Sequence, residues 1–213
     1  MPLGGTKLEE VDTFKYFGCI FSQHGNIVKE LEARCSKANA VSAQLRSTLF
    51  CKKEVSTKTK LSVHRSIFRP TLLYGSESWV DTGYLINKVE VTDMKVARMI
   101  AGTNRWEQWQ EGVHNEEIKE KLGMNTIDVA VRANRLRWWG HVTRMGEARL
   151  PKRLVGSAVE GRRSRGRPRR RYLDSVRNDF EVIGLTSEEA SKLALNRGSW
   201  RSFIRGTMLQ TER

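Results

Sequence analysis

The sequence predicts a mainly α-helical protein, with one N-terminal β-hairpin, about seven helices after it, and an extended arginine-rich arm. Three observations lead to this fold class. Strand-forming aromatic residues gather in 14–21, apolar residues recur at three- and four-residue steps after Ile27, and 155–170 lacks such a period and is rich in Arg and Gly. We expect a hairpin and thumb-like helical domain over 1–101 and a basic helical region with the arm over 102–213.

Two stretches outside the predicted helices carry aromatic residues. Residues 10–21 favour β structure, and Gly18 interrupts them where a bulge or a close backbone approach fits. A turn is expected over 22–26. Further along, Trp106 and Trp109 are expected in a loop.

Apolar periodicity and end signals predict the helices. Ser56 and Thr126 are N-cap residues, Pro70 is expected to end the second helix, and Gly123 is a C-terminal cap. The predicted helices, in order, are 27–49, 56–69, 84–100, a short helix ending at 122, 127–145, 171–183, and one that begins at the capping box 186–189.

Positive charge is concentrated in residues 132–171. This block contains 14 Arg or Lys and two acidic residues, so it carries +12 of the formal net charge of +14. Solubility requires only a mixed surface with a modest net charge, so the block indicates a polyanionic ligand. Nucleic acid is the first candidate. An anionic membrane surface is the second, but neither a lipidation motif nor an amphipathic anchor accompanies the charge, so we expect no membrane partner.

The composition argues against several other classes of protein. Cys19, Cys35 and Cys51 are odd in number and lack a C-x-x-C pair, which excludes a disulfide framework and an ordinary zinc knuckle. The four histidines are too scattered for a metal site, and the P-loop and H-E-x-x-H motifs are absent, so we expect no cofactor. Without a signal-peptide core, the chain is expected to be intracellular and nuclear.

Four segments lie in a specific order along the chain. They are F-K-Y-F-G-C-I-F-S with H-G after it at 14–25, R-P-T-L-L-Y-G-S-E-S-W at 69–79, R-L-R-W-W-G-H-V-T-R-M at 135–145, and G-R-P followed by N-R-G-S-W-R within 166–201. In this order they resemble the region after the palm in reverse transcriptases of non-long-terminal-repeat retrotransposons. Phe17 stands where Leu is usual and Tyr172 where Trp is usual, and both keep a large apolar side chain.

The resemblance implies the primer-grip hairpin, thumb and post-thumb region of an RNA-directed DNA polymerase from a transposable element. It implies that Lys15, Tyr16, Phe17 and Gly18 contact the primer end. Polymerisation needs paired carboxylates that hold two metal ions, and the sequence contains no Asp-Asp pair. We therefore expect a non-catalytic fragment, not an enzyme by itself. Its expected partners are RNA, DNA and the missing fingers–palm part of the polymerase.

Two other origins stay open at this point. The chain could be a stand-alone DNA-binding or adaptor protein derived from a retroelement. It could also be the product of a decayed element with no selected role. A single sequence does not separate these alternatives, nor does it decide between RNA and DNA.

The helix predicted over 127–145 carries a candidate binding face. Arg137, His141 and Arg144 are four and three residues apart, so they share one face and could meet phosphate groups. Trp138 falls on the apolar stripe of this helix and is expected in the core. Trp139 is offset from it by about 100° and is expected to stack on an unpaired base. The alternative is that both tryptophans belong to the core.

The arginine-rich arm supplies the remaining candidates. R-G-R-P-R at 165–169 matches the core of an AT-hook, so both readout of a narrow minor groove and general phosphate binding are open. The arm residues predicted to contact nucleic acid are Arg162, Arg163, Arg165, Arg167, Arg169, Arg170 and Arg171.

Overall fold

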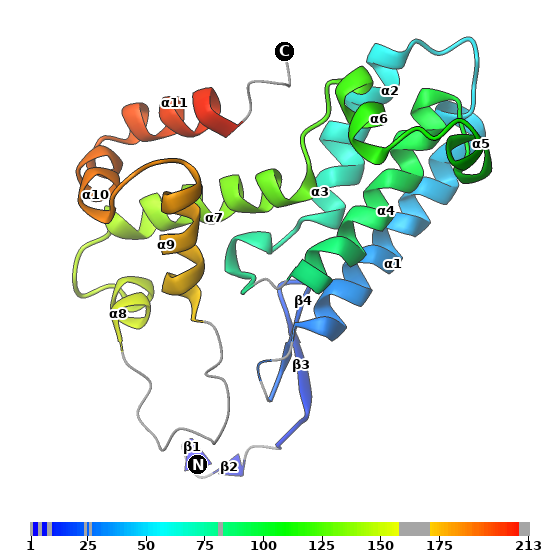
Figure 1. The fold of residues 1–213 in the computed structure, drawn as a ribbon. Coiled ribbons are helices and arrows are strands. Elements are labelled where there is room, and N and C mark those ends of the chain that lie inside the picture. Colours follow the sequence, from blue (N-terminus) through cyan, green and yellow to red (C-terminus); the bar gives the residue numbers. More distant parts are fainter. Residues whose placement is uncertain are drawn as a thin grey trace.

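The structure is a computed structural model that describes residues 2–3, 6–7, 10–23, 25, 27–80, 83–157 and 171–208. It confirms the expected fold class, because an N-terminal antiparallel hairpin precedes a mainly helical chain (Figure 1). The elements are β1 (Pro2–Leu3), β2 (Thr6–Lys7), β3 (Thr13–Tyr16), β4 (Cys19–Ser22), α1 (Val28–Leu45), η1 (Arg46–Phe50), α2 (Thr57–Val63), η2 (His64–Phe68), α3 (Arg69–Leu72), η3 (Ser76–Ser78), α4 (Gly83–Ala101), α5 (Arg105–Gln110), α6 (Asn115–Leu122), α7 (Ile127–Thr143), α8 (Leu150–Gly156), α9 (Tyr172–Val182), α10 (Ser187–Leu195) and α11 (Arg197–Met208).

The β3–β4 hairpin turns at Phe17 and Gly18. Tyr16 pairs with Cys19, and the two residues between them have φ angles of 45° and 82°. Two positive φ angles are characteristic of the tight type I′ hairpin turn, which favours glycine. Gly18 therefore forms the turn itself, with a strand on either side of it. Of the two expected features, a bulge or a close backbone approach, the bulge is not what the hairpin forms.

A first buried cluster fills the space between α1, α2, α3, α4, α6 and the beginning of α7. Its fully buried members include Ala38 of α1, Phe68 of η2, Val89 of α4 and Ile127 of α7. In Figure 1, α1 and α4 lie side by side on the right of the molecule, with α2, α3 and α6 around them. This helical layer carries the hairpin at its lower end.

The second helix does not end at Pro70 as predicted. The helical backbone passes from α2 through the π-helical turn η2 and continues as α3 to Leu72. Pro70 lies in the first turn of α3, where the missing amide N–H of proline is tolerated. Ser56 does cap α2 as predicted, because its side chain accepts a hydrogen bond from the Thr59 amide.

Trp106 and Trp109 lie on the short helix α5, not in a loop. Asn104 starts this helix, because its side-chain oxygen accepts hydrogen bonds from the amides of Trp106 and Glu107. The Glu107 carboxylate accepts a hydrogen bond from the Asn104 backbone amide and so completes a capping box. The sequence signal for this helix is N-x-x-E at 104–107.

A second buried cluster joins the end of α7 to α9, α10 and α11. Its members are Ala133, Leu136, Trp139, Val176, Phe180, Ala190, Ala194, Trp200 and Ile204. Helix α7 contributes Ile127 and Val131 to the first cluster and its later residues to the second, so it connects the two groups of helices. The predicted division of the chain at 101/102 stays a prediction.

Candidate nucleic-acid interface

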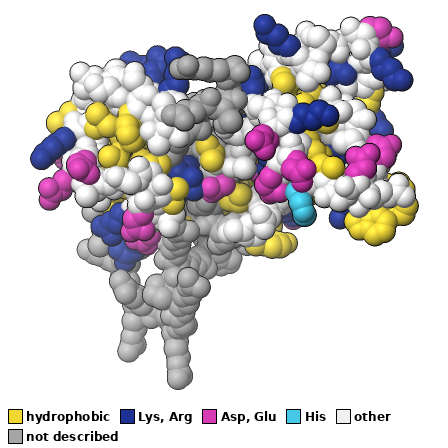
Figure 2. Space-filling model, turned by 45° about the horizontal axis from the view of Figure 1, so that its top comes forward, with side chains coloured by type: hydrophobic (Ala, Val, Ile, Leu, Met, Phe, Trp, Pro, Cys, Tyr) yellow, Lys and Arg dark blue, Asp and Glu magenta, His cyan; other side chains and the backbone are white. Residues whose placement is uncertain are grey.

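A basic groove lies between α7 and α11, and we call it the α7–α11 groove. It has a volume of about 420 Å³. Its lining residues are Arg137, His141, Arg144, Arg197, Trp200 and Arg201. None of these six carries a carboxylate. Over much of the face in Figure 2, Asp and Glu side chains lie among Lys and Arg, whereas the lining of this groove contains no Asp or Glu.

The predicted face of Arg137, His141 and Arg144 is therefore brought together as one lining. Helix α11 adds Arg197 and Arg201, which lie outside the predicted binding face. Both are exposed, and they lie four residues apart on the helix. The i, i+4 spacing of two arginines beside Trp200 was the signal that could have identified them.

Like charges are held together in this groove. Burial and then the positive charge of Arg197 lower the pKa of the Arg144 guanidinium, which still stays protonated at neutral pH. Arg144 is fixed in place, because its Nη1 donates a hydrogen bond of 2.6 Å to the Ala194 carbonyl oxygen. A bound anion would relieve the repulsion between these arginines.

The floor of the groove depends on close contact between α7 and α11. A Cβ atom at Gly140 would lie 2.2 Å from Nε1 of Trp200, so a glycine is needed for the indole to approach. The same nitrogen donates a hydrogen bond of 2.9 Å to the Leu136 carbonyl oxygen. Gly140 and Trp200 thus fix the distance at which the basic side chains of the two helices face each other.

The expected burial of the two neighbouring tryptophans is reversed. Trp139 is only 9% exposed and packs against the rings of Phe180 and Trp200, with centroid distances of 4.9 and 5.5 Å. Trp138 is half-buried and meets the edge of Tyr172. The reason is that α9, α10 and α11 pack against the side of α7 that carries Trp139, which the helical period of α7 alone does not reveal.

Part of the basic block is structural. Arg135 is 1% exposed, and its guanidinium binds the Asp179 carboxylate and the Trp79 carbonyl oxygen. Arg132 pairs with Asp128 and Asp179. These two arginines hold α7 and α9 together, so their charge is not available to a polyanion.

The four predicted hairpin residues lie together at one exposed tip. Phe17 is 77% exposed and Tyr16 is 55% exposed, and their rings are in edge contact at 4.3 Å. Lys15 is exposed on β3, and the space around the Gly18 Cα is open. Two aromatic rings, a cation and an open backbone are the groups that can contact a nucleotide.

Hydrogen bonds hold the hairpin tip against the helical body. Arg34 donates to the Gly18 carbonyl oxygen at 2.6 Å, and the Tyr74 hydroxyl donates to the Phe17 carbonyl oxygen at 3.0 Å. The Ile20 amide donates to Glu30, which also pairs with Arg34. The backbone of the tip is therefore anchored to the helices, although its aromatic side chains are exposed.

Most of the predicted arm lies outside the described residues. Arg162, Arg163, Arg165, Arg167, Arg169 and Arg170 belong to that part of the chain. Arg171 is described: it is exposed just before α9, and its amide donates to the Asp174 carboxylate. Binding by these seven arginines stays a prediction.

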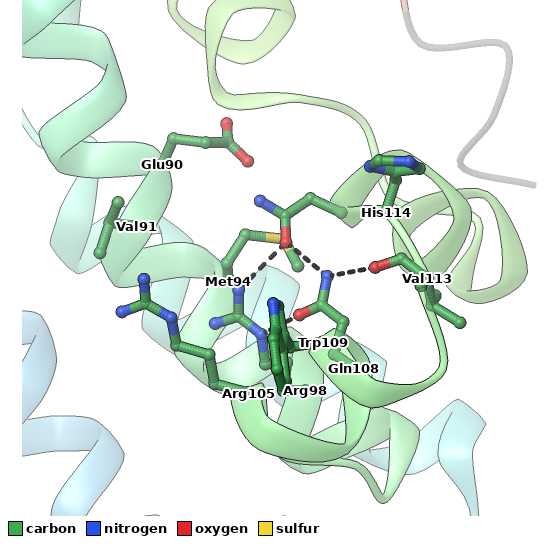
Figure 3. A pocket seen from close by; sticks show the side chains of 11 residues that line it. Glu90, Val91, Met94, Arg98, Arg105, Gln108, Trp109, Val113 and His114 are labelled. Atoms are coloured by element: carbon green, nitrogen blue, oxygen red, sulfur yellow. Dashed lines mark hydrogen bonds between the residues drawn. The ribbon is translucent and has the colours of Figure 1, made fainter.

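Another pocket lies between α4 and α5 (Figure 3). Its polar groups bind each other: Arg98 donates to Gln108 at 2.6 Å and to Asn115, and Gln108 donates to the Val113 carbonyl oxygen. These bonds secure the connection between α5 and α6. Beside them Trp106 and Trp109 are 61% and 71% exposed, with ring centroids 5.1 Å apart.

Two further observations concern the described part of the chain. Within it, no group of three His, Cys, Asp or Glu side chains is arranged to hold a metal ion. No described helix is both long and apolar enough to cross a membrane.

Comparison with known proteins gives one informative result. The chain is 26% identical, over 208 residues, to a putative uncharacterized transposon-derived protein of Caenorhabditis elegans. The match covers 96% of this chain and 74% of the relative. It supports a transposon origin. No family model and no solved structure matches the chain.

Proposed function

We propose that this chain is the nucleic-acid-binding, non-catalytic C-terminal part of a retrotransposon reverse transcriptase. The ordered motifs between residues 14 and 201 support the polymerase assignment. The similarity to a transposon-derived protein over 96% of the chain supports the origin. The hairpin and helices would hold the template–primer, and the basic surfaces would hold element RNA or target DNA.

The observation that carries the binding function is the α7–α11 groove. It presents Arg137, Arg144, Arg197 and Arg201 without a carboxylate among its lining residues. Guanidinium groups bind phosphate oxygens in a planar, two-pronged geometry, and each neutralised phosphate releases counterions. Such a groove therefore favours a phosphate backbone over an isolated small anion, which would satisfy only one or two of the arginines.

The hairpin tip supports a second contact with the same ligand. Its aromatic rings are exposed but its backbone is anchored, so a nucleotide could stack there without first ordering the loop. In the proposed function this tip meets the end of the primer strand.

A pair of charge-matched variants tests the proposal. Arg197→Gln with Arg201→Gln removes two charges from the groove, whereas Arg46→Gln with Arg177→Gln removes two exposed charges elsewhere. Affinity for a labelled oligonucleotide is measured by fluorescence anisotropy at several salt concentrations. We expect the groove variant to bind roughly tenfold or more weakly, with a log K against log salt slope reduced by about 1.4–1.8. Equal, small effects of the two variants would contradict binding in the groove.

A further inference from the structure

A second pocket adjoins the α7–α11 groove, between the α3–η3 segment and α7. Its volume is about 730 Å³. Aromatic and apolar side chains line it together with basic ones, and the lining includes Tyr74, Trp138, Arg65, Arg69, Arg137 and Glu77. We call it the Trp138 pocket. A mixed lining of this kind suits a nucleotide, whose base is flat and apolar and whose phosphate is charged.

Arg137 connects this pocket to the groove. It belongs to the lining of both, so the two depressions are neighbours along α7. Its Nη1 donates a hydrogen bond of 2.9 Å to Asn134, one turn earlier on the helix, which directs the exposed guanidinium along α7. A strand that placed one base in the pocket could therefore place its next phosphate at Arg137 and continue into the groove.

Trp138 is held in position, and part of its side chain stays exposed. Its ring meets the edge of Tyr172 at a centroid distance of 5.3 Å and an angle of 85°, and the Tyr172 hydroxyl donates to the Arg135 carbonyl oxygen. A half-buried indole with one fixed neighbour is preorganised for stacking, so little side-chain entropy is lost on binding. Trp139, by contrast, is packed inside the second buried cluster.

The two basic groups on the opposite wall are anchored. Arg69 is buried and bound to Asp93, and Arg65 donates to the Gly123 carbonyl oxygen. Asp93 neutralises the charge of Arg69, so Arg65 supplies the positive charge of this wall. Glu77 in the same lining repels phosphate, but its carboxylate can accept hydrogen bonds from base amino groups. The pocket therefore favours a base inside and the phosphates at its edge.

Tyr74 links the pocket to the hairpin. Its side chain lines the pocket, its hydroxyl binds the Phe17 carbonyl oxygen, and its ring lies 4.6 Å from the guanidinium carbon of Arg34. The hairpin tip, the Trp138 pocket and the α7–α11 groove thus follow one another across the surface. The pocket therefore lies between the two other surfaces proposed to bind the nucleic-acid strand.

We infer that the Trp138 pocket takes one unpaired base, stacked on Trp138, from a single strand or from a single-strand/duplex junction. The inference rests on the proposed nucleic-acid binding and narrows its substrate class. A base inside a regular duplex is stacked and paired on its neighbours, so it cannot enter such a pocket without being extruded.

The test compares four ligands: a single-stranded oligonucleotide, the same strand with one abasic position in each of several registers, a junction, and a blunt duplex. The variants are Trp138→Ala, Trp138→Phe and, as a matched control, Trp106→Ala. We expect Trp138→Ala to weaken single-strand and junction binding roughly 5- to 100-fold and duplex binding less than twofold. Trp138→Phe keeps a ring and should retain most of the affinity.

The abasic strands keep the test valid even if Trp138→Ala fails to fold. At one register the missing base should weaken binding to the wild-type chain and have no further effect on a folded Trp138→Ala chain. Two results would overturn the inference. One is an equal loss of affinity of Trp138→Ala for all four ligands, and the other is unchanged affinity of the wild-type chain for every abasic strand. If neither the Trp138 variants nor the Arg197→Gln/Arg201→Gln variant loses affinity, the proposed function fails together with the base pocket. If only the Arg197→Gln/Arg201→Gln variant loses affinity, the proposed function stands and only the base pocket fails.

Discussion

Arg135 and Asp179 form a buried ion pair that fastens α9 to α7. The Arg135 Nε lies 2.6 Å from the Asp179 Oδ2, and both side chains are almost fully excluded from solvent. Helix α11, which follows α9 and α10, contains Trp200 and two of the groove arginines, Arg197 and Arg201. The pair is therefore a positioning element for the proposed interface, although its own charges face inward.

Asp179→Asn should destabilise the chain by about 3–5 kcal/mol, because it leaves the Arg135 guanidinium buried without its counter-charge. Urea unfolding measures the change. The control is Glu32→Gln, which removes an exposed pair with Lys88 and should cost at most about 1 kcal/mol. A loss for Asp179→Asn as small as that of the control would show that water reaches Arg135.

Trp139→Ala should cost about 3–5 kcal/mol of unfolding free energy, because it opens a cavity between Phe180 and Trp200. Trp138→Ala should cost only about 1 kcal/mol, because that side chain is partly exposed and belongs to neither buried cluster. Thermal or urea unfolding of both variants checks the difference. The opposite order would restore the interpretation from helical periodicity, in which Trp138 is the core residue.

Stability should fall at low pH through Asp93. Burial raises the pKa of this carboxyl, but the hydrogen bond from His64 and the charge of Arg69 lower it by more than burial raises it. The pKa is therefore about 2 rather than 3.8. Since the folded pKa is the lower one, the stabilisation is present above about pH 4 and is lost as the pH falls towards 2. It amounts to roughly 2 kcal/mol.

The measurement is the unfolding free energy between about pH 5 and pH 2, for the wild-type chain and for Asp93→Asn. The wild-type chain should lose roughly 2 kcal/mol more than the variant over this range. Identical pH dependence of the two chains would mean that Asp93 titrates normally and that its buried contacts with His64 and Arg69 are not maintained.

The arm should contribute to the affinity for nucleic acid. Replacing its seven arginines, 162, 163, 165, 167, 169, 170 and 171, by Gln removes up to seven phosphate contacts. If about five are made, the slope of log K against log salt should decrease by roughly 3.5–4.5. An unchanged slope in a folded variant would identify the arm as a solvated connection between helices.

Local signals in the sequence were sufficient for most helices. Thr186 and Glu189 form the predicted capping box, Gly123 adopts the predicted left-handed conformation, and Thr126 caps α7. These features depend on neighbours within one turn, so the sequence alone determines them.

The candidate site was harder to predict because it depends on packing between distant helices. Arg135 lies on the apolar stripe of α7 with Val131 and Val142, and only the contact with Asp179 explains a charge there. Trp139 is buried in place of Trp138 because α11 approaches α7 at Gly140. No periodicity within α7 contains that information.

Photo-cross-linking tests the location of the interface most directly. The full chain is bound to a single strand that carries 4-thiothymidine or 4-thiouridine, irradiated, and mapped by peptide mass spectrometry. Adducts are predicted within 137–144 and 197–201 and at the hairpin residues 15–18. Adducts confined to α5, at Trp106 and Trp109, with none from the α7–α11 groove, would contradict nucleic-acid binding at this surface.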